Sequence, residues 1–324
     1  MKSFSLGTYA LTVGVAVALL AGCGGSQPPI GAPSTVPQTS ANATHTDRGK
    51  SWMLPEAKNE DLIYAVGGCG GTCVLSYPKG KLVGELTGVD GGADCSDSNG
   101  DVFISEQTDV VEFAHGGTTP IATYDTPYTP PSGCSVDPES GSLAVVNQGS
   151  VAVFPAGSQN PTSYNTLLNA QYCGYDNAGN LFVNGFDAPN FGLSELPKGG
   201  STFEKLTLDQ SVGQPGQIQW DGQYLSYESQ ESGQPTISRL SISDSTATVV
   251  GQTRLKRVPR ALRLSWIYQG SVVAPYVVSG PASKDIGIWK YPKGASTKRI
   301  MQFGDFNKKP FIFSGVTVSV GPSR

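Results

Sequence analysis

Cysteine is the residue of this chain whose spacing points most directly to chemistry. Cys95, Cys134 and Cys173 lie at a constant interval of 39 residues, and each opens a similar phrase that runs through a polar turn into an apolar segment. Three thiolates at one height suit a soft metal ion, and two of them suit a disulfide. The alternative is three small, buried, apolar side chains. Neighbouring repeats should hold the thiols too far apart to bond unless the space between them is narrow.

A second pair, Cys69 and Cys73, is separated by Gly-Gly-Thr, which allows a small bridged loop. We expect a disulfide here if the chain folds in an oxidising compartment. The closed loop is short, so its entropic stabilisation should stay below the roughly 3 kcal/mol of a 15-residue loop. A metal site at this place would need further ligands, and none lie nearby in the sequence.

The sixth cysteine, Cys23, follows a targeting segment. Lys2 supplies a positive start, residues 11–20 form a short apolar core, and Leu-Ala-Gly precedes the cysteine. This arrangement resembles the lipobox of bacterial lipoproteins. The resemblance implies that residues 1–22 are a signal peptide, that Cys23 is the site of lipid attachment, and that the protein is anchored in the cell envelope. Several acyl chains on one residue give stable anchoring.

Residues 23–51 read as a flexible tether. They are rich in Gly, Pro, Ser and Thr and carry only two large aliphatic residues, Ile30 and Val36. Such a segment cannot bury enough surface to offset its chain entropy. The remaining residues, 52–324, form the folded domain.

Other reactive groups are scarce. His45 lies in the tether and His115 in a turn, where we expect it to be solvated. The acidic stretch from Asp94 to Asp101 superficially resembles a calcium loop but lacks the terminal Glu, and hairpin turns look the same. No nucleophile elbow or His-rich metal motif is present, so the sequence assigns no catalytic residue, metal ligand or cofactor.

One basic segment stands out from a chain whose net charge is −4. A solvated strand that protects a sheet edge explains it, and the alternative is a site for carboxylated glycan, phosphate or lipid head groups. The acidic balance argues against nonspecific nucleic-acid binding. The five basic residues are Arg254, Lys256, Arg257, Arg260 and Arg263.

These residues belong to a repeat of about 40 residues, built from short strands and turns with Asp, Gly and Pro. The composition agrees, because 15 % of residues are charged and the chain contains 41 Gly and 23 Pro. Six apolar segments mark the second strand of each repeat: residues 62–65, 102–104, 143–145, 181–183, 224–226 and 272–274.

The phrase from Ser132 to Gly157 follows most closely the repeat of NHL-type six-bladed β-propellers, which the chain resembles over residues 61–320. The resemblance implies an all-β fold of six four-stranded antiparallel blades. The first repeat lacks a first strand, and residues 314–319 resemble residues 132–137. We therefore expect the C-terminal strand to complete the first blade, which leaves few exposed edges.

In such propellers the ligand site usually lies on the face where second strands end and first strands begin. A ring of polar side chains is expected there: Glu106, Asp109, Asn147, Asn184, Asp187, Glu228 and Glu231. We interpret the protein as a monomeric binding or scaffolding module for an unknown protein, glycan or small molecule. The alternative is a metal-dependent hydrolase or lyase, similar to the propeller lactonases, with calcium at the channel mouth.

Overall fold

The computed structural model describes residues 50–126, 130–231, 234–256, 262, 264–276, 285–301 and 313–322. The chain divides into two units, 1–42 and 43–324, and all described residues lie in the second. The expected signal peptide, Cys23 and nearly all of the tether lie outside the described residues. Within the described part, no helix is long and apolar enough to cross a bilayer.

The folded unit is built almost entirely from β-strands, which form five sheets, with one short 3-10 helix, η1 (Pro55–Asn59). The first sheet has the order β1 (Trp52–Met53), β4 (Leu82–Thr87), β3 (Gly71–Ser76), β2 (Leu62–Gly68) and β25 (Gly315–Ser319). The second contains β5 (Asp94–Ser96), β6 (Val102–Ser105), β7 (Asp109–Phe113) and β8 (Pro120–Asp125). The third contains β9 (Gly133–Val136), β10 (Leu143–Asn147), β11 (Ser150–Phe154) and β12 (Thr162–Asn165).

The fourth sheet has eight strands in two antiparallel halves. One half contains β13 (Asn169–Tyr175), β14 (Leu181–Asp187), β15 (Asn190–Leu196) and β16 (Glu204–Leu208). The other contains β17 (Gln214–Trp220), β18 (Leu225–Glu231), β19 (Gln234–Ser243) and β20 (Thr246–Arg254). The fifth sheet contains β21 (Trp266–Tyr268), β22 (Ser271–Tyr276), β23 (Asp285–Lys290) and β24 (Ala295–Met301).

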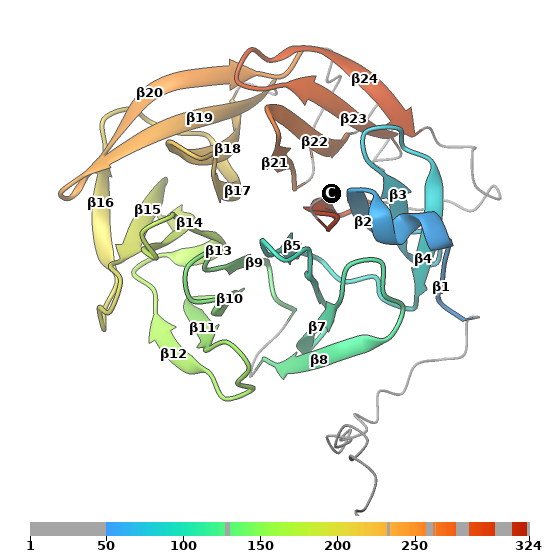
Figure 1. Cartoon of the computed structure of the whole chain (residues 1–324). Coiled ribbons are helices and arrows are strands. Elements are labelled where there is room, and N and C mark those ends of the chain that lie inside the picture. The colour runs from blue at the N-terminus through green and yellow to red at the C-terminus, as the bar shows by residue number, and fades with distance from the viewer. Residues whose placement is uncertain are drawn as a thin grey trace, which may run out of the picture. The chain divides into compact units, whose positions relative to one another are not determined.

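The sheets are arranged around a common centre, which makes the fold a β-propeller (Figure 1). The inner strands are β25, β5, β9, β13, β17 and β21; each contacts the next, and β21 contacts β25. The sequence predicted separate four-stranded blades, and the sheets depart from this in two places. Strand β1 adds a fifth strand to the first sheet, and β16 pairs in parallel with β20 through two residue pairs, which joins two groups of four.

Six clusters of buried apolar side chains lie between consecutive groups of strands. One of them joins Cys95 and Phe103 of the second sheet to Val145 and Phe154 of the third. Each sheet is packed on both faces, so its middle strands are largely buried; in β10 all five residues are buried, four apolar residues followed by Asn147. This explains why the second strands were recognisable in the sequence: all six predicted segments fall within or overlap strands.

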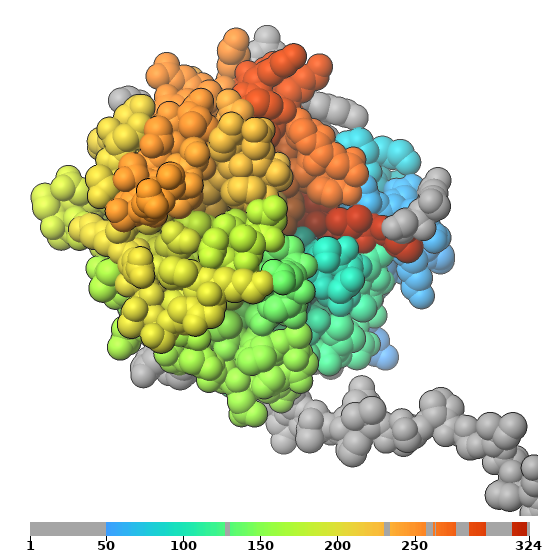
Figure 2. All heavy atoms as spheres, turned by 60° about the vertical axis from the view of Figure 1, so that its left-hand side comes forward, coloured from blue at the N-terminus to red at the C-terminus, as the bar shows by residue number. Residues whose placement is uncertain are grey.

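The C-terminal strand closes the ring as the sequence predicted. Strand β25 pairs antiparallel with β2, with Ser319 opposite Leu62 and Val316 opposite Ala65. In the space-filling view the red C-terminal strand lies between orange residues of the last sheet and blue-green residues of the first two (Figure 2). The Ser96 hydroxyl donates to the Val318 carbonyl at 2.8 Å, which fixes the strand from the side of the second sheet.

Candidate functional site

A cavity of about 400 Å³ opens at the centre of the ring, on the face where first strands begin and second strands end. Its position follows from the strands that contribute to it, because the lining residues lie in or shortly before five different inner strands or lie in β18. A volume of this size is typical of small-molecule sites. The lining residues are Gly92, Tyr172, Gln214, Pro215, Gly216, Glu228, Ser229, Leu262, Leu264 and Ser314.

Glu228 is the charged side chain among these lining residues. It lies on β18 and is 5 % exposed. Its Oε2 accepts hydrogen bonds from the Ser265 backbone N–H at 3.2 Å and from the Ser265 hydroxyl at 2.6 Å. Burial raises the pKa of Glu228 to about 7, and the two hydrogen bonds from Ser265 limit the rise. The carboxyl group therefore changes its charge near neutral pH.

Gly216 lets this carboxyl group approach the backbone of β17. A Cβ atom at Gly216 would lie 3.1 Å from the Oε1, Cδ and Cγ atoms of Glu228, so a larger residue would press directly on the side chain. The pairing of β17 with β18 shifts register between Pro215 and Ile218. This irregularity brings three consecutive residues of β17, Gln214 to Gly216, to the cavity wall.

Asn184 on β14 also forms a hydrogen bond to the backbone of the following repeat, as Glu228 does one repeat later. Its Oδ1 accepts from the Tyr172 backbone N–H at 3.2 Å, and its Nδ2 donates to the Gly216 carbonyl at 2.8 Å. Strand β13 also shifts register here, between Ala170 and Tyr172. The buried amide of Asn184 thus holds two lining residues from two groups of strands in fixed positions.

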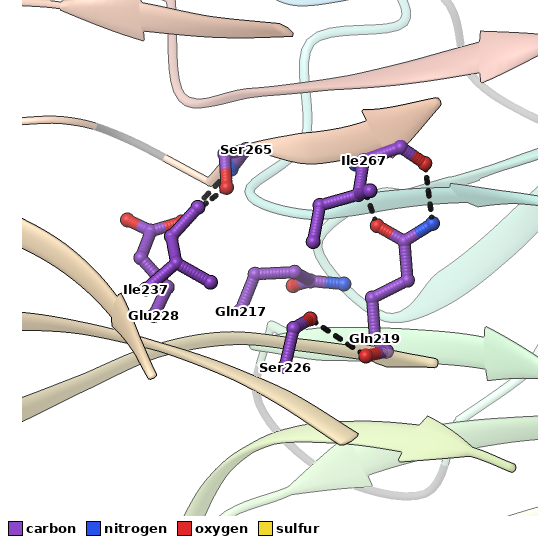
Figure 3. Close-up of a pocket in the computed structure, with 7 residues that line it drawn as sticks. All are labelled: Gln217, Gln219, Ser226, Glu228, Ile237, Ser265 and Ile267. Carbon is purple, nitrogen blue, oxygen red and sulfur yellow. Dashed lines mark hydrogen bonds between the residues drawn. The ribbon is translucent and has the colours of Figure 1, made fainter. Parts of the chain in front are cut away.

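A narrow polar cleft continues from Glu228 between β17, β18 and β21 (Figure 3). The side-chain amide of Gln219 bonds to both backbone groups of Ile267, donating to its carbonyl at 2.9 Å and accepting from its N–H at 2.7 Å. The side-chain amide therefore pairs with the backbone of β21 as the backbone of a neighbouring strand would. The Ser226 hydroxyl donates to the backbone carbonyl of Gln219 at 2.6 Å, and this hydrogen bond is also drawn in Figure 3.

The other members of the predicted polar ring are placed differently. Burial, together with the charges of Asp90 and Asp109, raises the pKa of Glu106 to about 7, but Glu106 does not line the cavity. Asn147 is buried, and its amide atoms have no hydrogen-bond partner among the described residues. Asp187 forms an ion pair with Lys205. The side chain of Glu231 lies outside the described residues. Of the six whose side chains are described, Glu228 is the one that lines the cavity.

Four of the five described cysteines are joined in two disulfides. Cys69 and Cys73 form a disulfide between β2 and β3. Cys95 and Cys134 form a second disulfide, with their Cα atoms 5.8 Å apart, so neighbouring inner strands approach more closely than we expected. Cys173 is a buried free thiol whose pKa is raised by burial.

Among the described residues of the basic segment, and for His115, the structure shows no place in the cavity wall. Arg254 and Lys256 are exposed at and beyond the end of β20, and Arg257, Arg260 and Arg263 lie outside the described residues. His115 is not the solvated turn residue that we expected: it is half-buried, its Nδ1 lies 2.6 Å from the Ser319 hydroxyl, and burial lowers its pKa.

The acidic stretch from Asp94 to Asp101 forms a hairpin turn, and its side chains are not grouped as metal ligands. Asp97 accepts from the backbone N–H groups of Asn99 and Asp101 within its own turn, as a hairpin turn does. No group of three or more His, Cys, Asp or Glu side chains suited to a metal was found in the part of the chain that the structure describes.

Sequence reasoning missed Tyr172, Ser229 and Ser265. Tyr172 could have been found, because it directly precedes Cys173, one of the three cysteines that mark the repeat. Ser265 follows a segment whose repeat boundaries are indistinct.

Comparisons with known proteins establish the fold and nothing finer. No protein-family description matches the chain, and no curated protein matches it. Among solved structures, a chain of the nidogen/laminin complex superimposes with a TM-score of 0.62 at 12 % identity, covering 81 % of this chain and 99 % of that one. A protein of unknown function from Bacteroides caccae gives 0.60 at 11 % identity over the same shares. The structure of U3-55K gives 0.51 at 9 % identity, over 78 % of this chain and 84 % of that one.

Proposed function

We propose that the protein is a binding or scaffolding module whose six-bladed, NHL-like propeller takes its ligand at the cavity of about 400 Å³ in the channel mouth. The two halves of the eight-stranded sheet count as two blades, because only two residue pairs join them and a separate core cluster lies between them. A binding role suits this fold, which positions loops and strand ends from many blades around one centre.

The observation that carries the proposal is the construction of the cavity wall. It combines residues from several sheets, and two of its polar groups, Glu228 and Ser229, are buried. The Ser229 hydroxyl has no hydrogen-bond partner among the described residues. Buried polar groups usually have partners, and a ligand hydroxyl or amine would supply one.

We also propose that Cys23 carries lipid and that residues 23–51 hold the propeller away from an envelope membrane. The support is the lipobox-like order of the N-terminal residues. Replacing Cys23 with Ser should move the protein from the membrane fraction to the soluble fraction. A protein that stays in the membrane fraction after this change would contradict the anchor.

The binding role is tested with the full-length chain purified in detergent. A library of neutral, cationic and anionic small molecules is screened by thermal shift, and hits are repeated with Gly92→Phe, which fills the cavity. Space exists for the new side chain, because a Cβ atom at Gly92 meets nothing nearer than 3.7 Å. The matched control is Ala156→Phe, at an exposed turn after β11. We expect hits that Gly92→Phe abolishes and Ala156→Phe leaves unchanged.

Two results would overturn this role. One is the absence of any hit that depends on Gly92. The other is tightly held calcium in the purified protein together with a hydrolytic activity that chelation removes, which would replace the binding role by metal-dependent hydrolysis.

A further inference from the structure

We propose that the channel-mouth cavity selects small compounds that carry a positively charged nitrogen, with the carboxyl group of Glu228 as the anchor for that charge; this deepens the proposed binding function and rests on it. The class is that of ammonium or guanidinium groups on a compact body of roughly ten heavy atoms, which a cavity of about 400 Å³ accommodates.

The first argument is the charge balance of the wall. Among the described lining residues, Glu228 is the one charged side chain, and the others are neutral. Its hydrogen bonds come from the uncharged Ser265, and no ion pair of the described residues includes it. A carboxylate removed from water is costly unless a cation or several donors compensate it. A cationic ligand supplies that compensation.

The second argument is what surrounds the carboxyl group. The described residues that line the cleft with it include Gln217 on β17, Ile237 on β19 and Ser265 ahead of β21, and none of the described cleft residues other than Glu228 titrates. Burial is the largest cause of the shift of its pKa to about 7, and no charged neighbour among the described residues contributes to that shift. Among the described residues, the charge in this part of the wall therefore comes from Glu228.

The third argument is the set of neutral groups beside it. The buried Ser229 hydroxyl can accept from an N–H or donate to a hydroxyl of the ligand. Tyr172 adds an aromatic side chain to the wall, and aromatic rings attract cations. An anionic ligand would instead meet Glu228 as a like charge.

The test uses three compounds of one shape: 2-phenylethylamine, 2-phenylethanol and phenylacetate. Their binding to the full-length chain in detergent is measured by ligand-observed NMR titration at about pH 8 and about pH 6. We expect the amine to bind at least about tenfold more tightly than the alcohol at the higher pH, and phenylacetate to bind most weakly. Amine affinity should fall about tenfold at the lower pH, because affinity follows the ionised fraction of Glu228.

Two variants separate a binding role of Glu228 from a structural one. Glu228→Gln keeps an oxygen that can accept the bonds from Ser265, so it should retain binding of the alcohol while losing the preference for the amine and the dependence on pH. Glu106→Gln is the matched control, because Glu106 also has a pKa of about 7 and does not line the cavity. It should behave as the wild type.

The outcomes distinguish this inference from the binding role itself. The cationic class is overturned if the wild type binds the amine and the alcohol equally, or if the preference for the amine survives in Glu228→Gln. The binding role still stands in that case, provided that library hits depend on Gly92. If no compound of any class depends on Gly92, both fail.

Discussion

The most direct physical consequence of the site is that Glu228 should destabilise the fold as pH rises. Its pKa is 4.5 as a reference and about 7 in the folded protein. Between these values the folded state binds more protons than the unfolded state, so the free energy of unfolding falls as pH rises through this window. A shift of this size lowers the free energy of unfolding by about 3 kcal/mol at pH 8 and hardly at all at pH 4.5.

Glu228→Gln removes this dependence because the amide does not ionise, and its oxygen still accepts from Ser265. The assay is urea-induced unfolding of the wild type and the variant at about pH 4.5 and about pH 8, followed by tryptophan fluorescence. We expect the loss of stability over this range to be smaller in the variant by about 3 kcal/mol. Glu56→Gln is the control, because Glu56 is exposed and should leave the dependence almost unchanged.

Equal losses of stability in the wild type and in Glu228→Gln would refute the reasoning. Glu106 acts in the same direction, because its pKa is also raised to about 7, but it is partly exposed and its contribution should be smaller. The wild type should therefore keep some pH dependence even after Glu228 is replaced.

Three further predictions concern the framework of the site. Replacing Cys95 and Cys134 with Ala, which opens a loop with a sequence separation of 39, should lower the free energy of unfolding by about 4 kcal/mol, and an unchanged urea midpoint under oxidising conditions would argue against the bridge. Gly91→Ala should strongly destabilise the fold, since its Cβ would lie 1.1 Å from the Ser105 carbonyl oxygen, whereas the neighbouring Gly92→Ala should be tolerated; similar melting temperatures would contradict the packing of this turn. Ser265→Ala should cost about 1.5 to 3 kcal/mol at pH 8 and less at pH 4.5, where Glu228 is neutral, and calorimetry at the two pH values tests the difference.

The propeller fold was predictable because each repeat carries its own local signal. Apolar second strands and Pro-x-Gly turns recur with the period that Cys95, Cys134 and Cys173 mark, and local patterns of this kind survive without knowledge of distant contacts. The joining of β16 to β20 was not predictable, because two outer strands meet through only two residue pairs and neither sequence carries a signal for its partner.

The site was predictable only in part, for a geometric reason. Position after a second strand correctly drew attention to Glu228, but the same rule included Asp187, which turns outward to Lys205. Whether a side chain at a strand end faces the centre depends on register shifts such as the one between Pro215 and Ile218. The closeness of Cys95 and Cys134 likewise depends on the width of the central space, which no single repeat encodes.

The pairing of β25 with β2 means that the first sheet can be completed only after the C-terminal strand has been synthesised. A ribosome makes Leu62 long before its partner Ser319, so the inner edge of β2 stays unpaired until β25 has been made. An open strand edge invites pairing with other chains. Synthesis of β25 therefore decides whether the first sheet is completed: a chain that stops before Gly315 keeps this sheet open to aggregation or proteolysis, even when its middle repeats have formed.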